Sequence, residues 1–303
     1  MTYAAHHLVT LLLAWAAAAA MARSRWVVRA PRTGVLIWQA IALTGFASLV
    51  GLALAAGLSP YRLGVMPALA RFTADVARGA LPAGVSVAHV LAIGLGVALT
   101  LWVLAAFALT CRTLAGLRRR QRTLLELVAR QDPEAHEALI VDHPAVAAYC
   151  VPGRQAAIVL STGTLGLLRA GELAAVLAHE RAHLRERHDL ALLPFTVLER
   201  AFPWSRTVAA MRRQAATLVE MRADDSAARA HGHATLSAAL RRFRACDRLP
   251  VPLGTLGGID GDIDARLDRL TAPARTPLLL RALLLSAALT VVSTPLSLFL
   301  LPL

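Results

Sequence analysis

Four long apolar runs stand out in the pattern of hydrophobic and polar positions along this chain. They cover residues 3–22, 35–57, 87–110 and 282–301, and none of them contains an Asp, a Glu or an Arg. An α-helix needs about 20 residues to cross a hydrocarbon core that is about 30 Å thick. The pattern therefore predicts an α-helical membrane protein with about four transmembrane helices.

A different pattern fills the stretch between the third and the fourth run. Apolar residues recur at helical spacing over 113–130, and this helix is expected to lie along or just below the membrane. Short β-type runs follow at 139–142, 146–151 and 156–161, the last two joined by a hairpin connection at 152–155. Beyond them the pattern predicts helices at 162–169, 171–188, 190–202, 205–231, 233–248 and 262–271, with a Pro- and Gly-rich loop at 249–261.

These patterns predict three parts. Residues 1–111 hold three transmembrane helices, residues 112–275 form an inserted, mostly α, α+β domain, and residues 276–303 form a C-terminal transmembrane helix. The fold class is therefore a helical membrane protein with an inserted α+β domain.

The arginines predict the orientation of these parts. Clusters follow the first and the third run directly, at Arg23, Arg25, Arg29 and Arg32, and at Arg112, Arg118, Arg119, Arg120 and Arg122. Positive residues next to spans favour the cytoplasmic side. The inserted domain is therefore expected in the cytoplasm of a multi-pass cell-membrane protein, with both termini outside. The first run is expected to stay as a span, because a signal peptide would carry its positive charge before the apolar stretch.

The net charge of +13 raises the question of an acidic partner. Neither a zinc knuckle, nor a helix-turn-helix signature, nor a basic-aromatic stripe accompanies it, and much of the arginine lies beside the spans. No direct nucleic-acid binding is therefore expected, and the anionic headgroups of the lipid bilayer are the expected partner.

The segment HERAH in the middle of the chain carries the first candidate chemistry. His179 and His183 are four positions apart, so on a helix they direct two imidazoles to one side, with Glu180 beside them. This is the spacing of a zinc-binding helix with an adjacent general base. An ordinary solvated helix face is the alternative, since an HExxH string arises by chance in roughly one chain of this length per hundred.

A third ligand is available on the next long helix pattern. Glu220 and Asp224 are again four positions apart, and small residues at Ala178, Ala182, Ala223 and Ala227 would let the two helices cross closely. Glu220 would complete a three-ligand catalytic site, and Asp224 would accept the second ring N–H of a ligand histidine. The other histidines of this region, His136, His143 and His188, are interpreted as surface or capping residues.

HERAH followed by E-x-x-A-D-x-x-A at 220–227 resembles the gluzincin pattern of membrane-embedded zinc peptidases, which include HtpX-type and CAAX-prenyl-protease-type enzymes. The segments AYCVPGRQAAIVLSTGTLGLL, FPW and ARLDRL make the chain most similar to the BlaR/MecR-type family, in a short form without its extracellular sensor domain. The resemblance implies Zn²⁺ held by His179, His183 and Glu220, Glu180 as the general base, and Asp224 behind the ligands.

The predicted function is that of a zinc metalloendopeptidase acting on a cytoplasmic or membrane-proximal protein or peptide, which adds as a strand to the edge of the 146–161 hairpin. Candidates for stabilising the transition state are Arg229, His231 and His233. The substrate is expected to be a repressor protein in a signalling pathway, with a separate sensor as a further partner. The alternatives are HtpX-like quality control of membrane proteins and a non-catalytic, zinc-binding membrane regulator; a transporter is disfavoured because the spans carry almost no ionisable residue.

Overall fold

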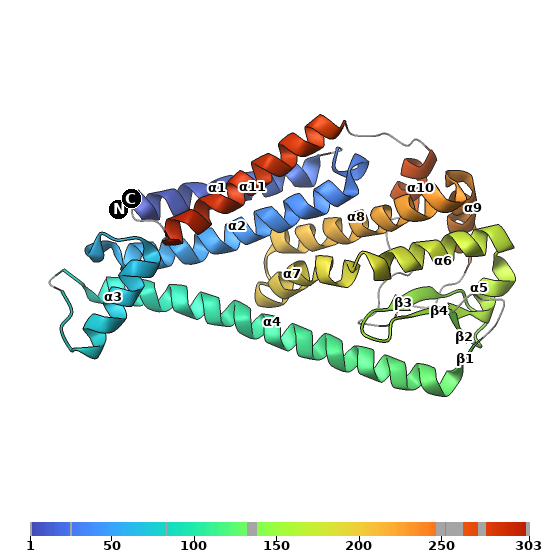
Figure 1. Cartoon of the computed structure of the whole chain (residues 1–303), viewed down its shortest axis with the longest axis horizontal. Coiled ribbons are helices and arrows are strands. Elements are labelled where there is room, and N and C mark those ends of the chain that lie inside the picture. The colour runs from blue at the N-terminus through green and yellow to red at the C-terminus, as the bar shows by residue number, and fades with distance from the viewer. Residues whose placement is uncertain are drawn as a thin grey trace.

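The computed structural model describes residues 2–24, 26–82, 84–131, 138–246, 252, 263–271 and 277–300. Long helices lie side by side in one half of an elongated molecule, and a small sheet with shorter helices forms the other half (Figure 1). The first and last helices bring the two ends of the chain together at the pole far from the sheet (Figure 1).

Four of the described helices are long and apolar enough to cross a membrane. They are α1 (Thr2–Arg23), α2 (Pro31–Gly57), α4 (Val87–Val128) and α11 (Leu278–Leu300). Helix α2 is the central one, since α1, α4 and α11 all pack against it. The four apolar runs predicted from the sequence are thus all helical.

Helix α4 corrects one prediction, because the third span and the expected amphipathic helix at 113–130 are a single helix of 42 residues. At 1.5 Å per residue it is about 63 Å long. The segment beyond Thr110 consists mostly of Leu, Arg, Ala and Gln, which favour helix, and contains no proline. The helix therefore continues away from the apolar half instead of turning along its surface.

The connection between the second and third runs contains a helix that the sequence analysis did not predict. This helix is α3 (Val65–Ala77), and a 3-10 turn, η2 (Ser59–Tyr61), precedes it. A second 3-10 turn, η1 (Val27–Arg29), lies between α1 and α2. Val65 and Ala68 of α3 are buried against α2 and α4 in one apolar cluster. These elements lie at the two ends of the candidate membrane helices.

The sheet has four strands in the order β1-β2-β4-β3. The strands are β1 (Ala129–Gln131), β2 (Ala138–Val141), β3 (Ala148–Val151) and β4 (Ala157–Ser161). β2 and β4 are parallel, whereas β1–β2 and β3–β4 are antiparallel, so the predicted hairpin at 146–161 is present. β3 is the edge strand on the side of the next long helix, α6.

The remaining helices follow the predicted order. They are α5 (Thr162–Leu167), α6 (Ala170–Arg185), α7 (His188–Ala201), α8 (Arg206–His231), α9 (His233–Arg244) and α10 (Ile263–Thr271). The predicted loop at 249–261 lies outside the described residues except for Pro252, as does the Asp132-Pro133 end expected for the helix at 113–130.

Two groups of buried residues hold α6 and α8 in place. Val176 and Leu177 of α6 pack with the sheet and α9, while Leu218 and Met221 of α8 pack with Trp38 of α2. The helix that carries HERAH is thus fixed to the sheet, and the helix that carries Glu220 is fixed to the candidate membrane helices.

Candidate metal centre

Helices α6 and α8 pack against each other through alanines. Ala182, Ala223 and Ala227 are fully buried, and so is Ala175 two turns earlier on α6. Because these side chains end at Cβ, the two backbones approach closely enough for longer side chains beside the alanines to meet. The crossing predicted from the small residues is present.

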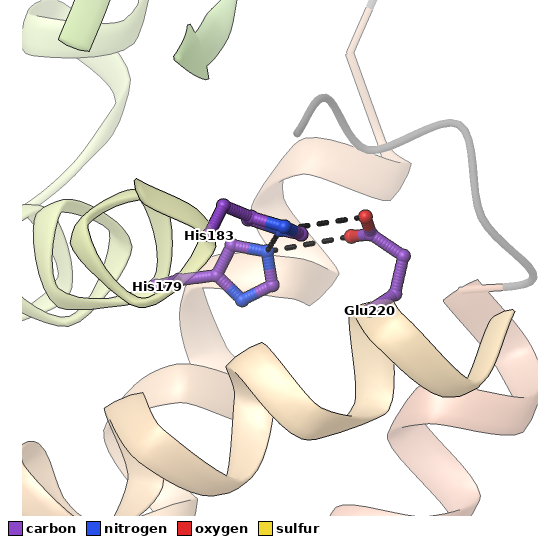
Figure 2. Close-up of side chains that lie close together, drawn as sticks. All are labelled: His179, His183 and Glu220. Atoms are coloured by element: carbon purple, nitrogen blue, oxygen red, sulfur yellow. Dashed lines mark hydrogen bonds and ion pairs between the residues drawn. The ribbon is translucent and has the colours of Figure 1, made fainter. Parts of the chain in front are cut away.

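His179, His183 and Glu220 meet at this crossing (Figure 2). The Nε2 atoms of the two histidines are 3.1 Å apart, and the Glu220 carboxylate lies 3.3 Å from His179 Nε2 and 3.4 Å from His183 Nε2. Three atoms bound at about 2.0–2.2 Å to a tetrahedral zinc are about 3.3–3.5 Å apart. The donor types and their separations therefore fit a zinc ion.

The protonation states of His183 and Glu220 agree with a ligand role, whereas His179 would have to lose a proton to bind a metal. Burial lowers the pKa of His183 to about 3, so this imidazole is neutral and has a lone pair to offer. Burial acts against ionisation of Glu220, but His183, His179 and Arg266 outweigh it and lower the pKa of its carboxyl to about 2. Burial also lowers the pKa of His179, but hydrogen bonds to Asp224 and Glu220 outweigh that effect and raise it to about 9.

Glu180 lies on the same helix and is 2 % exposed. Its Oε2 atom is buried and has no hydrogen-bond partner within the described residues. Burial raises the pKa of this carboxyl to about 7, and the thiol of Cys150 on β3 hydrogen-bonds to it. Glu180 is thus a desolvated carboxyl between the His/Glu cluster and the edge strand.

Asp224 lies one turn beyond Glu220, and its Oδ1 is 3.0 Å from Nδ1 of His179. This is the partner that the sequence spacing predicted for one of the two histidines of HERAH. Accepting a hydrogen bond from Nδ1–H leaves Nε2 unprotonated and facing the cluster.

Arg266 of α10 is a member of the site that sequence reasoning missed. Its guanidinium is 2 % exposed and donates from Nε and Nη2 to Asp224, at 2.8 and 2.7 Å, while Nη1 lies 3.3 Å from Glu220 Oε2. Burial raises the pKa of Asp224, but Arg266 outweighs it and holds the pKa well below its usual range. The available signal was an arginine on the apolar side of the amphipathic segment ARLDRL, 42 residues from Asp224.

His188 corrects another prediction, because it is 4 % exposed and not a surface residue. Its Nδ1 lies 2.9 Å from Nδ1 of His183, and its Nε2 lies 3.6 Å from Glu186. Arg222 donates to both oxygens of Glu186, at 2.8 and 2.9 Å. Each histidine of HERAH therefore has a polar partner on its Nδ1 side.

The three candidates for transition-state stabilisation lie away from the cluster. Arg229 and His233 are exposed and His231 is partly exposed. Arg229 and His231 follow Glu220 by nine and eleven residues on α8, which places them about 13–17 Å along the helix axis. The described part of the chain does not bring them to His179, His183 and Glu220.

Two crossing helices that offer two imidazoles and a carboxylate, with a second buried carboxyl beside them, are typical of metallopeptidases. Residues 115–244, a stretch that includes both helices of the cluster, match the model of peptidase family M48. The comparisons with curated proteins and with solved structures give no match. The finer resemblance to the BlaR/MecR-type family stays a prediction.

Proposed function

We propose that this protein is a membrane-embedded, zinc-dependent endopeptidase that hydrolyses peptide bonds of a cytoplasmic or membrane-proximal protein. The observation that carries the proposal is the buried cluster of His179, His183 and Glu220, with donor separations of 3.1–3.4 Å. A zinc ion held there would lower the pKa of a bound water and polarise a carbonyl group. The peptidase unit would comprise about residues 112–275, as the sequence predicts.

Glu180 is the residue we assign to proton transfer. It neighbours ligand His179, is buried, and keeps Oε2 without a hydrogen-bond partner in the described part of the chain. Such an oxygen is available to accept a proton from an attacking water and to pass one to the leaving amine. Asp224 is occupied by Arg266 and His179. Glu220 Oε2 also has no hydrogen-bond partner in the described part of the chain, but it lies 3.3 Å from His179 Nε2, on the side where the metal would bind.

The edge strand β3 would bind the substrate as an additional strand. Among the described strands it pairs with β4 alone, and Cys150 in its middle contacts Glu180. Backbone hydrogen bonds to an edge strand hold a peptide in extended form, which exposes its carbonyl groups to the adjacent catalytic residues.

A non-catalytic zinc site is the main alternative. A structural zinc is held by four protein ligands, whereas a catalytic zinc keeps one position open. Among the described residues the metal-ligating group contains three side chains, His179, His183 and Glu220. This composition supports the catalytic interpretation.

The decisive experiment compares the purified protein with Glu180→Gln. The wild type is expected to bind about one zinc and to cleave peptides in a chelator-sensitive way, while Glu180→Gln keeps the metal and loses hydrolysis. Metal content is measured by elemental analysis and cleavage with a fluorogenic peptide library. Full activity of Glu180→Gln would refute the assigned mechanism. A wild type that binds zinc without cleaving any peptide would favour the alternative, a membrane regulator with a non-catalytic zinc site.

A further inference from the structure

The turn that joins α7 to α8 lies beside the middle of the candidate membrane helices. The indole Nε1 of Trp102 on α4 donates to the carbonyl of Ala201, the last residue of α7, at 2.9 Å. Trp102 precedes Thr110, near the end of the apolar part of α4, by eight residues, which corresponds to about 12 Å of helix. The turn is thus at a depth where α4 would be inside a bilayer.

Helices α1 and α2 place the turn at a similar depth. A cavity of about 330 Å³ is lined by Leu11 and Trp15 of α1, Phe46 of α2, and Phe202 and Trp204 of the turn. Trp15 precedes the end of α1 at Arg23 by eight residues, which is again about 12 Å. Helices α4 and α1 therefore give one level for the turn, and Phe46 places it beside the middle of α2.

The chemistry of the turn suits a lipid environment. Its sequence is Phe202-Pro203-Trp204, and the Trp204 side chain is 74 % exposed. Several backbone groups at the two helix ends have partners: the Ala201 carbonyl accepts from Trp102, and Ser205 caps α8 by accepting from the Val208 N–H at 3.3 Å. Satisfied backbone groups are a requirement for any segment placed in hydrocarbon.

Of the charged residues next to the turn, Glu199 is paired and Arg200 is directed outward, whereas Arg206, directly after the turn, is exposed. Glu199 forms an ion pair with Arg212. Arg200 extends back along α4 to Thr113, beyond the apolar part of that helix, where Nη1 is 3.4 Å from the hydroxyl. Long arginine side chains near a membrane boundary place the guanidinium in the polar layer in this way.

Contacts of α8 with α1 and α2 show where α8 passes out of the apolar layer. Gln214 donates to the carbonyl of Ala22, at the end of α1, at 3.0 Å. Leu218 packs directly against Gly34 near the start of α2, since a Cβ on Gly34 would lie 2.9 Å from Leu218 Cδ1. The boundary of the apolar layer therefore lies near residues 214–218 of α8. Glu220 follows by two to six residues, or about 3–9 Å.

From this geometry we propose that the α7–α8 turn, residues 201–205, is inserted in the bilayer, and that the insertion fixes the His179–His183–Glu220 cluster at the membrane surface. The enzyme then cuts peptide bonds that are held within about 10 Å of the bilayer, which for a chain leaving a membrane span corresponds to about three extended residues. The second part rests on the proposed endopeptidase function, whereas the first does not.

Spin labels in liposomes test the insertion without any need for catalysis. Trp204→Cys and, separately, the exposed Pro203→Cys are labelled in a background with Cys111 and Cys246 replaced by serine; Cys150 is fully buried. Gln155→Cys, in the exposed turn between β3 and β4, is the control. Labels at 203 and 204 are expected to collide more with oxygen than with a water-soluble nickel chelate, and the label at 155 the reverse. If all three labels behave alike, the turn is not inserted.

A series of single-span substrates tests the cleavage position in the same liposomes. One cleavable segment is placed directly after the span, or behind a semi-rigid helical spacer of 10 or 20 residues, about 15 or 30 Å long. Cleavage is expected to fall at least tenfold with the longer spacer and to recover with a flexible Gly/Ser linker of equal length, which lets the segment return to the surface. Equal rates for all spacers would overturn the surface position. If these substrates and soluble peptides all stay uncut, the proposed function fails, and the spin labels still decide the insertion.

Discussion

At the scale of single residues, the candidate metal centre depends on what lies behind the two histidines. His179 has Asp224 behind Nδ1, and His183 has His188. Of these partners, only Asp224 could be predicted from the sequence, because it is one helical turn from Glu220 on the same face. A partner that lies on an element without another site residue, as His188 does on α7, shows no such spacing in the sequence.

His188 illustrates why the rest could not be predicted. The sequence pattern predicts a helix through residue 188, but α6 ends at Arg185 and Arg187 adopts a left-handed conformation with φ of 51°. This break turns the chain back, so that His188 begins α7 and lies against His183. Arg266 is a second case, since its burial depends on how α10 docks 42 residues beyond Asp224.

A first prediction concerns His188→Ala. Removing the imidazole leaves His183 Nδ1 without its partner, so the ring loses its fixed orientation, and zinc affinity is expected to fall about 10- to 100-fold. Competition with a chromophoric chelator measures the affinity. His188→Gln, which retains a hydrogen-bond acceptor, serves as the matched control and should lose less. An affinity unchanged in His188→Ala would show that the contact does not position the ligand.

A second prediction concerns Glu172, the carboxylate at the start of α6. It accepts from the backbone N–H of Arg169 at 2.9 Å and from Arg242 of α9 at 3.1 Å, and these contacts, led by the backbone hydrogen bond, lower its pKa. Glu172→Gln keeps the shape but removes the charge, so the free energy of unfolding should fall by about 1 kcal/mol at pH 7.

The sign of the pH dependence follows from the lowered pKa of Glu172. The stabilisation by the charged form is fully present above the unfolded-state pKa of about 4.3–4.5, and it is lost as the pH falls through the lower pKa of the folded state. Thermal unfolding of wild type and Glu172→Gln in detergent should therefore converge below about pH 4. Glu126→Gln, at an exposed position on α4, is the control; a pH-independent gap between Glu172→Gln and wild type would contradict the prediction.

At the scale of elements, hydrophobic periodicity predicted nearly every helix and three of the four strands. It missed the continuity of α4, because periodicity describes which face is apolar and not whether a helix bends at the end of its apolar part. It also missed how α7 and α8 pack between α2 and α4, since a pattern shows that a face is buried but not against which partner. Gln39 of α2, which donates to the Ala191 carbonyl of α7 at 2.9 Å, is one such contact.

A third prediction tests the packing of α2 on α8, the helix that carries Glu220. A Cβ at Gly34 would meet Val27 Cγ1 at 2.7 Å and Leu218 Cδ1 at 2.9 Å, whereas at Gly45 of the same helix the nearest atom, Ala14 Cβ, is 3.9 Å away. Gly34→Ala should lower the free energy of unfolding by about 1–3 kcal/mol through overpacking. Gly45→Ala should leave it unchanged or raise it, because alanine favours helix. Equal unfolding temperatures for the two variants in detergent would contradict this account.

At the scale of the whole molecule, the four candidate spans follow from run length and hydropathy, because only a continuous helix satisfies its backbone in hydrocarbon. The α7–α8 turn could not be found in this way: Phe202, Pro203 and Trp204 are too few for a span, and their depth depends on contacts with α1, α2 and α4. The orientation of the bundle depends on charge outside the spans, which is a separate property of the sequence.

A fourth prediction addresses that orientation. The arginine clusters after the first and third runs predict that the peptidase unit faces the cytoplasm and that both termini are outside. Fusions to alkaline phosphatase, which is active only outside the cytoplasm, are expected to be inactive after residue 130 and active at the N-terminus or after residue 303. An active fusion after residue 130 would reverse the topology and exclude a cytoplasmic substrate.

The last prediction concerns the breadth of substrates. A protease that serves a signalling pathway cuts one or a few proteins, such as a repressor, so its loss changes a small set of transcripts. A quality-control protease handles many membrane proteins, so its loss raises the abundance of many unrelated ones. A catalytic site within about 10 Å of the bilayer is compatible with either role, since a soluble repressor can also dock at the surface. Comparison of the proteome and transcriptome of the wild type with those of a Glu180→Gln strain separates the two, because the variant leaves His179, His183 and Glu220 unchanged. We expect a focused transcriptional change with few accumulating proteins, and broad accumulation of membrane proteins without such a change would assign the enzyme to quality control.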